Sequence, residues 1–392
     1  MEIEPLLYQY NPWWEDRFFL DSVVDRKQIL SSLQQLMNTP EIILLTGLRR
    51  VGKTTIMKCL IRYLIDKQAV APQHCFYVSM DDYQLSKMSL IDMIDSYRKI
   101  LKVPIRQKIY VFFDEITYVH NFQIQLKNIY DKGNVKCVVS SSSSSVLKDD
   151  SAYLTGRKRV IEINPLDFEE YLEFKNIHLS KADQGLLETH FLEYMQTGGM
   201  PEYVLREERE YLVNLIDDII MKDIVGYHGI RYPRIIKDLF VLLMERAGKQ
   251  VSINKIANIL KISPDTTKRY LAMFEETYLI WLVPRFGKTN ETLLSPKKVY
   301  ATDIGMRNII VGFRDRGAIF ENLVFMKIKN KDPQYVSTTG QEIDFFVNGT
   351  LIEVKYHKDI EGKQLEAFNS FNAKQKIVIK NYADLQKLNN VL

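Results

Sequence analysis

The chain has 392 residues, of which 46% are hydrophobic and 26% are charged. This length and this share of apolar residues predict two or three globular domains with buried cores, and they exclude a chain that is disordered throughout. The net charge of +4 is mildly basic, so it permits contact with nucleic acid without requiring it.

The cysteines and the apolar runs bear on the cellular location of the protein. Cys59, Cys75 and Cys137 are widely spaced inside apolar segments, which fits neither a disulfide framework nor a zinc-binding pattern. The first residues carry no basic leader, and no apolar run approaches the roughly 18 residues that a membrane span needs. We therefore expect a soluble cytoplasmic protein without a membrane partner.

A glycine-containing turn stands between a predicted strand and a predicted helix. Residues 41–46 form a short apolar run typical of a buried parallel strand, and residues 55–65 have the apolar spacing of a helix. This order points several unpaired backbone N–H groups, and the positive end of a helix dipole, at one spot where a phosphate can bind. The residues predicted to bind the nucleotide there are Gly47, Leu48, Arg49, Arg50, Val51, Gly52, Lys53, Thr54 and Thr55.

The residue types in this turn match the pattern of P-loop proteins. Gly47 and Gly52 let the backbone approach a phosphate without a Cβ in the way. In this pattern Lys53 reaches the β and γ phosphates, and the Thr54 hydroxyl is a ligand of Mg²⁺. We therefore expect ATP and Mg²⁺ as cofactors. The alternative is a glycine-rich turn that binds nothing.

A second predicted strand ends in two acids. Residues 108–113 are apolar after the first, and Asp114 and Glu115 follow at the carboxyl end, where open α/β sheets place their ligands. Asp114 would hold the magnesium ion through water, and Glu115 would polarise the attacking water. The alternative is a strand that ends in a solvated acidic turn.

Another apolar strand, residues 74–80, lies between these two halves in the chain. An additional strand, together with a glutamate beside the aspartate, resembles the AAA-type ATPases of the additional-strand catalytic-glutamate class. The resemblance implies ATP as the nucleotide and a polar γ-phosphate sensor after the next strand, residues 135–139. One of Ser140–Ser143 would be this sensor, and we select Ser142 although six identical residues leave the choice open. The alternative is a flexible serine loop.

A basic turn at residues 154–159 leads into a further strand. Arg157 or Arg159 could stabilise charge on the transferred phosphoryl group, either in its own chain or across the interface of a homo-oligomer. Either arginine could equally be an ordinary surface charge.

The middle of the chain is predicted to be helical. Residues 165–172 and the turn at residues 197–203 resemble prokaryotic AAA-type ATPases fused to a nuclease-like C-terminal domain, and the resemblance implies that the helices after this turn form a lid. Farther on, residues 251–260 and 263–276 predict two helices, the second with Ser263 as its N-cap. Strands that follow them complete the pattern of a winged helix, a module that binds DNA or a protein partner.

A hairpin near the C-terminus places two acids face to face. Asn348-Gly349 is a strong two-residue turn signal, and pairing across it sets Asp344 opposite Glu353. Opposed like charges destabilise a sheet unless something compensates them, and a divalent cation beside Lys355 would do so. This arrangement resembles the metal site of restriction-endonuclease-like nucleases, with Glu321 as the additional acid of the preceding helix. The alternatives are a solvated hairpin face neutralised by Lys355, or a nuclease fold without activity.

These predictions combine into an α/β protein whose leading function is Mg²⁺-dependent ATP hydrolysis, as a switch that acts on DNA or on a protein partner. The alternatives are an ATP-gated, metal-dependent DNA nuclease and a non-hydrolysing ATP-binding recruitment module. The predicted domains are an ATPase core at residues 1–165, a helical lid or linker at 166–235, a winged-helix-like module at 236–302 and a nuclease-like αβ domain at 303–392.

Overall fold

A computed structural model describes residues 3–15, 20, 23–144, 153–180, 183–338 and 340–391, so Ser145 of the serine run lies outside the described residues. The chain forms two compact units, Met1–Asn164 and Pro165–Leu392. Among the described residues, no helix is long and apolar enough to cross a membrane. The three cysteines are buried and form no disulfide.

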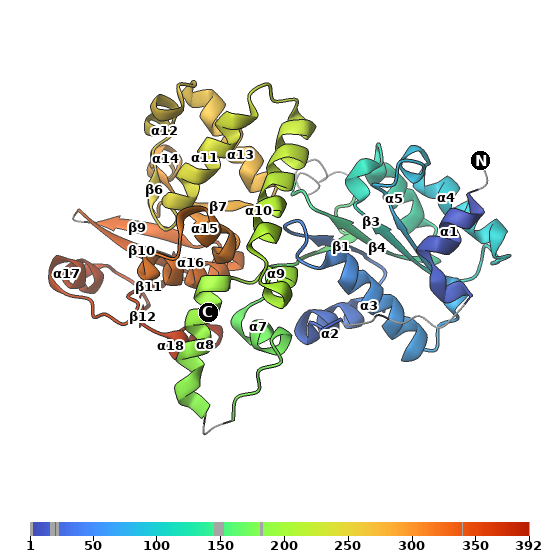
Figure 1. The fold of residues 1–392 in the computed structure, drawn as a ribbon, viewed down its shortest axis with the longest axis horizontal. Helices are drawn as coiled ribbons and strands as arrows, with labels where there is room; N and C mark the ends of the chain where they lie inside the picture. The colour runs from blue at the N-terminus through green and yellow to red at the C-terminus, as the bar shows by residue number, and fades with distance from the viewer. Residues whose placement is uncertain are drawn as a thin grey trace. The chain divides into compact units, whose positions relative to one another are not determined.

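The first unit is built on a sheet (Figure 1). Its strand order is β2-β3-β4-β1-β5. Every pairing in it is parallel. All residues of β1 are buried, as expected for a strand covered on both faces. The predicted α/β fold class is therefore confirmed. The strands are β1 (Ile42–Thr46), β2 (Cys75–Ser79), β3 (Ile109–Asp114), β4 (Val135–Ser141) and β5 (Lys158–Glu162).

The order of the strands in the sheet differs from their order in the chain. β2 follows β1 in sequence, yet it lies at the edge beyond β3, and the strand inserted between β1 and β3 is β4 (Figure 1). The inserted strand is therefore β4, and the prediction that it is residues 74–80 is wrong. The difference arises because a crossover connection can place the next parallel strand several positions away.

Helices connect and cover these strands. The predicted helix after the glycine turn is α3, and the serine run continues from β4. The helices of this unit are α1 (Glu4–Tyr10), η1 (Pro12–Trp14), α2 (Lys27–Leu36), α3 (Lys53–Asp66), η2 (Pro72–His74), η3 (Leu85–Lys87), α4 (Leu90–Ile100), η4 (Ile116–Tyr118) and α5 (Phe122–Asp131).

The second unit combines many helices with two small sheets, ordered β6-β8-β7 and β12-β11-β10-β9. One apolar core joins α7, α8 and α16 to strands of both sheets. Its helices are α7 (Phe168–Phe174), α8 (Gln184–Thr197), α9 (Pro201–Arg206), α10 (Arg209–Asp218), η6 (Ile219–Gly226, a π-helix), α11 (Pro233–Glu245), α12 (Ile253–Leu260), α13 (Pro264–Glu276), α14 (Thr289–Leu294), α15 (Ile304–Val311), α16 (Arg316–Ile328), η7 (Lys329–Lys331), α17 (Gly362–Ser370) and α18 (Tyr382–Val391).

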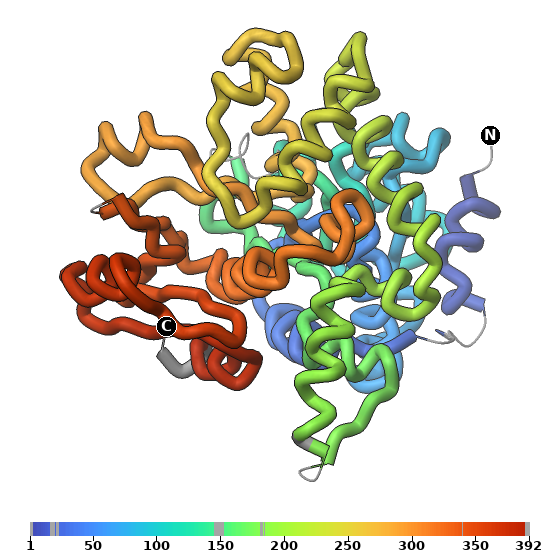
Figure 2. The backbone as a smooth tube through the Cα atoms, turned by 60° about the vertical axis from the view of Figure 1, so that its left-hand side comes forward, coloured from blue at the N-terminus to red at the C-terminus, as the bar shows by residue number. Residues whose placement is uncertain are grey.

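The strands of this unit confirm the predicted register of the hairpin. Val347 pairs with Thr350 across the Asn348-Gly349 turn, and the last strand adds to the sheet in parallel beside β11. These strands belong to the C-terminal part of the chain, which is red in Figure 2. The strands are β6 (Gln250–Val251), β7 (Ile280–Val283), β8 (Lys297–Ala301), β9 (Gln334–Thr338), β10 (Gln341–Val347), β11 (Thr350–Val354) and β12 (Gln375–Ile379).

The two sheets of the second unit are joined by main-chain hydrogen bonds just after β7. The N–H of Tyr335 in β9 donates to the carbonyl of Pro284 at 3.1 Å, and the N–H of Phe286 donates to the carbonyl of Tyr335 at 2.7 Å. Ser263 caps α13 as predicted, because its hydroxyl accepts from the N–H of Thr266. The winged-helix assignment of this region stays a prediction.

The double-glycine turn after α8 is a close approach of three backbone segments. The N–H of Leu166 donates to the carbonyl of Gly199 at 2.7 Å, and the N–H of Gly199 donates to Asp303 Oδ2 at 2.7 Å. A Cβ at Gly199 would overlap the carbonyl oxygen of Leu166. Burial raises the pKa of Asp303 to about 6. The glycines therefore have a packing role.

We expect Gly199→Ala to lower the free energy of unfolding by about 1–3 kcal/mol, because the backbone must move to admit the new methyl group. Denaturant unfolding followed by circular dichroism measures the change. The matched control is Gly185→Ala in α8, where a Cβ meets open space. That change should leave the stability unchanged or raise it by up to about 1 kcal/mol. Equal effects of the two substitutions would contradict the packing role.

Candidate functional site

The predicted nucleotide loop joins β1 to α3 in a conformation that its glycines permit. Gly47 and Gly52 have φ values of +133° and +97°, in the range that side chains rarely adopt. A Cβ on Gly47 would overlap the carbonyl oxygen of Ile163. Leu48 and Val51 are buried and anchor the loop, while Thr54 and Thr55 are exposed at the start of α3. The N–H groups at the start of a helix are suited to a phosphate.

Lys53 is the buried cation of this site. Its ammonium donates to the carbonyls of Gly47 at 2.9 Å and Leu48 at 3.0 Å, and to Ser142 Oγ at 2.9 Å. The loop thus holds its own lysine in place with two backbone acceptors. The remaining loop residues between the two glycines are Arg49, which is half-buried, and Arg50, which is exposed and has a φ of +63°.

Ser142 also contacts Glu115, so three of the predicted residues form one chain of hydrogen bonds. The Ser142 hydroxyl donates to Glu115 Oε1 at 2.5 Å, and its backbone N–H donates to Oε2 at 3.2 Å. Glu115 has a φ of +51°, which is uncommon for a residue with a side chain. The structure therefore brings together a lysine, a serine and a carboxylate at the carboxyl ends of β1, β4 and β3.

Asp114 and Thr54, the two predicted metal ligands, are in contact. The Thr54 hydroxyl donates to Asp114 Oδ2 at 2.5 Å. Ser140 Oγ donates to the other carboxylate oxygen, and Tyr77 Oη donates to Oδ2 at 2.9 Å. Burial and then the charge of Asp114 raise the pKa of Tyr77 far above its usual value. Hydroxyl and carboxylate oxygens are the donors that Mg²⁺ prefers, so these residues fit that ion.

Sequence reasoning did not identify the contacts of Ser140 and Tyr77 with Asp114. Tyr77 lies on β2, whose pairing with β3 sets Ser79 beside Asp114. The only signal in the sequence was the alternation of side chains along β2, which cannot reveal a neighbour without the strand order. Ser140 is one of six identical residues, so nothing in the sequence distinguished it.

The two candidate arginines lie at the opposite end of the sheet from the loop. Arg157 forms an ion pair with Asp131 at 3.4 Å, and Arg159 forms one with Glu41 at 3.5 Å and is 62% exposed. Lys158 pairs with the first residue of β1, five residues before the loop begins. Five residues of strand span about 16 Å. The structure therefore does not bring either arginine to the loop of its own chain, and a role across a subunit interface stays a prediction.

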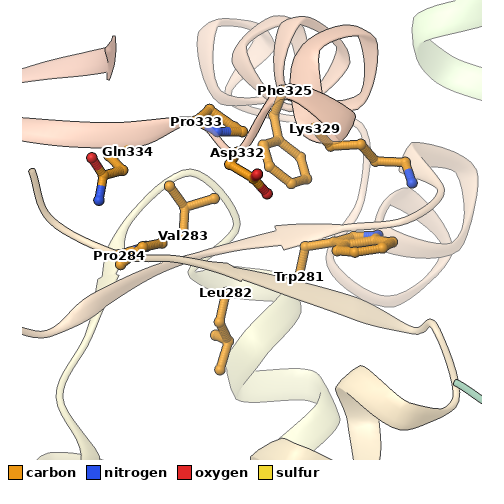
Figure 3. Close-up of a pocket in the computed structure, with 9 residues that line it drawn as sticks. All are labelled: Trp281, Leu282, Val283, Pro284, Phe325, Lys329, Asp332, Pro333 and Gln334. Carbon is orange, nitrogen blue, oxygen red and sulfur yellow. The ribbon is translucent and has the colours of Figure 1, made fainter. Parts of the chain in front are cut away.

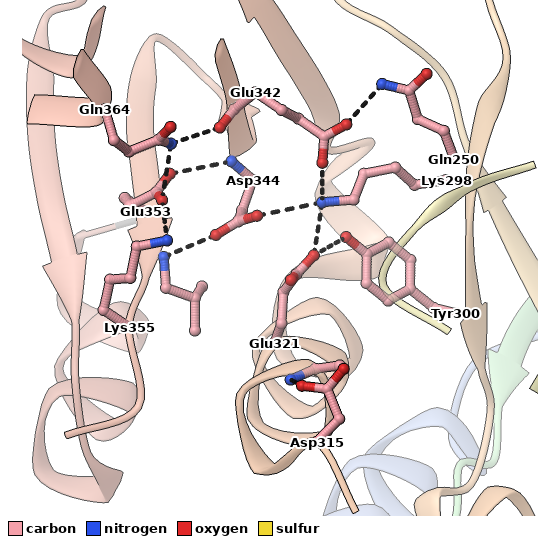
Figure 4. A network of polar contacts seen from close by, with 12 residues as sticks. Gln250, Lys298, Tyr300, Asp315, Glu321, Glu342, Asp344, Glu353, Lys355 and Gln364 are labelled. Atoms are coloured by element: carbon pink, nitrogen blue, oxygen red, sulfur yellow. Dashed lines mark hydrogen bonds and ion pairs between the residues drawn. The ribbon is translucent and has the colours of Figure 1, made fainter. Parts of the chain in front are cut away.

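The four residues of the predicted nuclease-like site do come together in the second unit (Figure 4). Asp344 and Glu353 are buried. The N–H of Asp344 donates to Glu353 Oε2 at 3.4 Å, and Lys355 Nζ lies 2.8 Å from Glu353 Oε1. Glu321 from α16 and Asp344 both contact the same lysine. The alternative of a solvated hairpin face is wrong in the solvation, because both acids are buried, whereas the pairing with Lys355 that it included is present.

The shared partner is Lys298 on β8, which we did not predict. Its ammonium is fully buried and lies 2.7 Å from Glu321, 2.9 Å from Glu342 and 3.2 Å from Asp344 (Figure 4). Among the described residues, no three acidic, histidine or cysteine side chains form a group that could hold a metal ion. The buried ammonium of Lys298 is thus one counter-charge of these acids, and the predicted divalent cation stays a prediction.

The cluster contains more carboxyl groups than ammonium groups. Burial and then Asp344 raise the pKa of Glu321 to about 8 and that of Glu353 to about 7. Lys298 and Lys355 lower these two pKa values but do not outweigh burial. Tyr300 Oη also donates to Glu321 Oε1 at 2.6 Å. The ammonium of Lys298 is therefore important for the stability of the second unit.

We expect Lys298→Met to lower the free energy of unfolding by about 3 kcal/mol or more, because buried carboxylates lose their counter-charge. Chemical denaturation at neutral pH measures this loss. Lys249→Met is the control, since Lys249 is exposed and lies 3.4 Å from Asp315 in a surface ion pair. That substitution should cost less than about 1 kcal/mol. Similar losses in both variants would show that the buried ammonium has no special role.

A separate pocket of about 220 Å³ lies in the second unit (Figure 3). Two of the lining residues are in contact, because the ammonium of Lys329 lies 4.1 Å from the centre of the Trp281 ring. None of the predicted site residues lines this pocket, so it belongs neither to the nucleotide loop nor to the acidic cluster. Its lining residues are Trp281, Leu282, Val283, Pro284, Phe325, Lys329, Asp332, Pro333 and Gln334.

The fold and the loop together define the class of the first unit. Residues 39–172 match a family described as an AAA domain. With the parallel sheet and the loop geometry, this match makes the first unit a P-loop AAA-type ATPase domain that binds nucleotide. Residues 188–317 and 316–392 match two domains of unknown function, DUF8612 and DUF4143.

The chain belongs to the family of the uncharacterized protein MJ1544 of Methanocaldococcus jannaschii. The two are 32% identical over 345 residues, which cover 82% of this chain and 76% of that protein. An uncharacterized protein of Haemophilus influenzae is 27% identical over 83% of this chain and 84% of its own length. The solved structure of the Aeropyrum pernix ORC1 protein in complex with DNA has a TM-score of 0.37 and 13% identity, and it covers 80% of this chain and 96% of that one. A likeness this low supports no inference.

Proposed function

We propose that the protein is a Mg²⁺-dependent ATPase that acts as a nucleotide-driven switch on DNA or on a protein partner. The observation that carries this proposal is the contact of Ser142 with both Lys53 and Glu115, at 2.9 Å and 2.5 Å. The side chain that would bind phosphate and the side chain that would activate water thus share one partner. A bound phosphate would alter both contacts at once.

The residues of the site would divide the chemistry as follows. The N–H groups at the start of α3 and the Lys53 ammonium would bind the β and γ phosphates. Thr54 and Asp114 would hold Mg²⁺, which supplies neutralising charge when bound. Glu115 would accept a proton from, or orient, the attacking water. Ser142 would contact the γ phosphate and release Glu115 from its present hydrogen bonds.

We expect Glu115→Gln to reduce ATP turnover by at least about 100-fold while leaving ATP affinity within about threefold, because the amide cannot act as a base but keeps the shape of the site. Phosphate release in the presence of Mg²⁺ measures turnover, with and without duplex DNA. Glu41→Gln is the matched control, since Glu41 precedes β1 at the far end of the sheet and contacts Arg159. It should keep full turnover.

The outcomes of this assay separate the candidate functions. Unchanged turnover in Glu115→Gln would contradict the assigned role and favour the non-hydrolysing recruitment module. An ATP turnover that rises with duplex DNA would support DNA as the partner. A turnover that does not change when DNA is added would favour a protein partner. The ATP-gated nuclease predicts cleavage of the added DNA, and the buried contact of Lys298 with Glu321 and Asp344 argues against it.

A further inference from the structure

The last residues of the first unit are bonded to the end of β1 and pack against the nucleotide loop. The N–H of Ile163 donates to the carbonyl of Thr46, the last residue of β1, at 2.7 Å. Gly47, the first residue of the loop, packs so closely on Ile163 that a Cβ has no room. The position of Ile163 is therefore tied to the first residue of the loop.

Arg26 forms a second link at the other side of the loop. It lies just before α2 and is only 6% exposed. Its Nη1 donates to the carbonyl of Val51 at 3.3 Å and to the carbonyl of Asn164 at 2.8 Å. Hydrogen bonds from a charged donor are stronger than neutral ones. One guanidinium group thus joins the loop to the final residue of the first unit.

The second unit holds the chain again only two residues later. The N–H of Leu166 donates to the carbonyl of Gly199 at 2.7 Å, and its own carbonyl accepts from Tyr194 Oη at 2.8 Å. Gly199 in turn is held by Asp303. Between the bonded residues Ile163 and Leu166 stand only Asn164 and Pro165, and the proline fixes one backbone angle. We call the four residues Ile163–Leu166 the connector. Both of its ends are held by hydrogen bonds, and only two residues lie between them.

Two buried polar atoms near the connector have no hydrogen-bond partner among the described residues. They are Thr46 Oγ1 and Asn164 Oδ1. Such atoms are rare in folded proteins, because a buried polar atom without a hydrogen bond lowers the stability. A second arrangement of the connector that gives them partners would regain part of this stability.

From these contacts we propose that Arg26 is a positioning residue that couples the nucleotide loop to the connector Ile163–Leu166. The inference rests on the proposed nucleotide site. Phosphate binding would shift the backbone of the loop, and with it the carbonyl of Val51. Because the guanidinium of Arg26 binds both carbonyls, the backbone of Asn164 would move as well. The short connector would then move the backbone at Leu166, which is bonded to the Gly199 turn of the second unit.

Hydrogen exchange of the full chain, with and without Mg²⁺ and the non-hydrolysable analogue AMPPCP, tests this coupling. In the wild type, the analogue should slow exchange in the loop at residues 48–54 and change the exchange rates at Leu166 and Gly199 by at least about threefold. In Arg26→Gln, the loop should still be protected, whereas the change at Leu166 and Gly199 should be lost.

Two further variants distinguish coupling from a structural role. Arg98→Gln is the matched control, because Arg98 is 8% exposed and also donates to two backbone carbonyls, those of Pro104 and Gln107. It should keep the full response. Arg26→Lys should restore the response, since one ammonium can also donate to two carbonyls, as Lys136 does with Thr39 and Glu41.

The possible failures are distinct. Without loop protection in the wild type, the proposed nucleotide site itself is wrong. Loop protection without any change at Leu166 and Gly199, or an undiminished change in Arg26→Gln, overturns the coupling alone. Should Arg26→Gln not fold, titration of the wild type with the analogue decides. The midpoints for the loop and for Leu166 must then coincide, and separate midpoints overturn the proposal.

Discussion

The structure of the nucleotide site depends on where the ammonium of Lys53 is held. Two carbonyls of its own loop and the hydroxyl of Ser142 surround it. Because Ser142 follows β4 and also contacts Glu115 after β3, this one cation connects the carboxyl ends of three neighbouring strands. The arrangement requires β4 to lie between β1 and β3, so the strand order of the sheet is the constraint on which the site rests.

Local patterns predicted the parts of this site well. The glycine loop, the acids after β3 and the register of the hairpin at Asn348-Gly349 depend on residues close together in sequence, where backbone sterics and side-chain alternation decide the structure. The position of β4, the distance of Arg157 from the loop and the contact of Tyr77 with Asp114 depend on long-range strand pairing. Single-sequence periodicity carries no information about such pairings.

In the acidic cluster, too, local sequence predicted one part and long-range pairing decided the other. Opposed Asp344 and Glu353 implied a compensating cation, and that implication was sound. One counter-charge is the ammonium of Lys298, which lies on a strand 46 residues before Asp344 and belongs to a different sheet. Because its ammonium is fully buried among carboxylates, the cluster has the character of an internal charge network that joins the two sheets of the second unit.

Isothermal titration with ATP and Mg²⁺ of the wild type and Lys53→Ala tests the central claim most directly. The account predicts saturable 1:1 binding by the wild type and at least about tenfold weaker binding by the variant, which is about 1.4 kcal/mol. Lys67→Ala, at the exposed far end of α3, is the control and should bind like the wild type. Equal affinities of the wild type and Lys53→Ala would contradict the assignment of the loop as the nucleotide site.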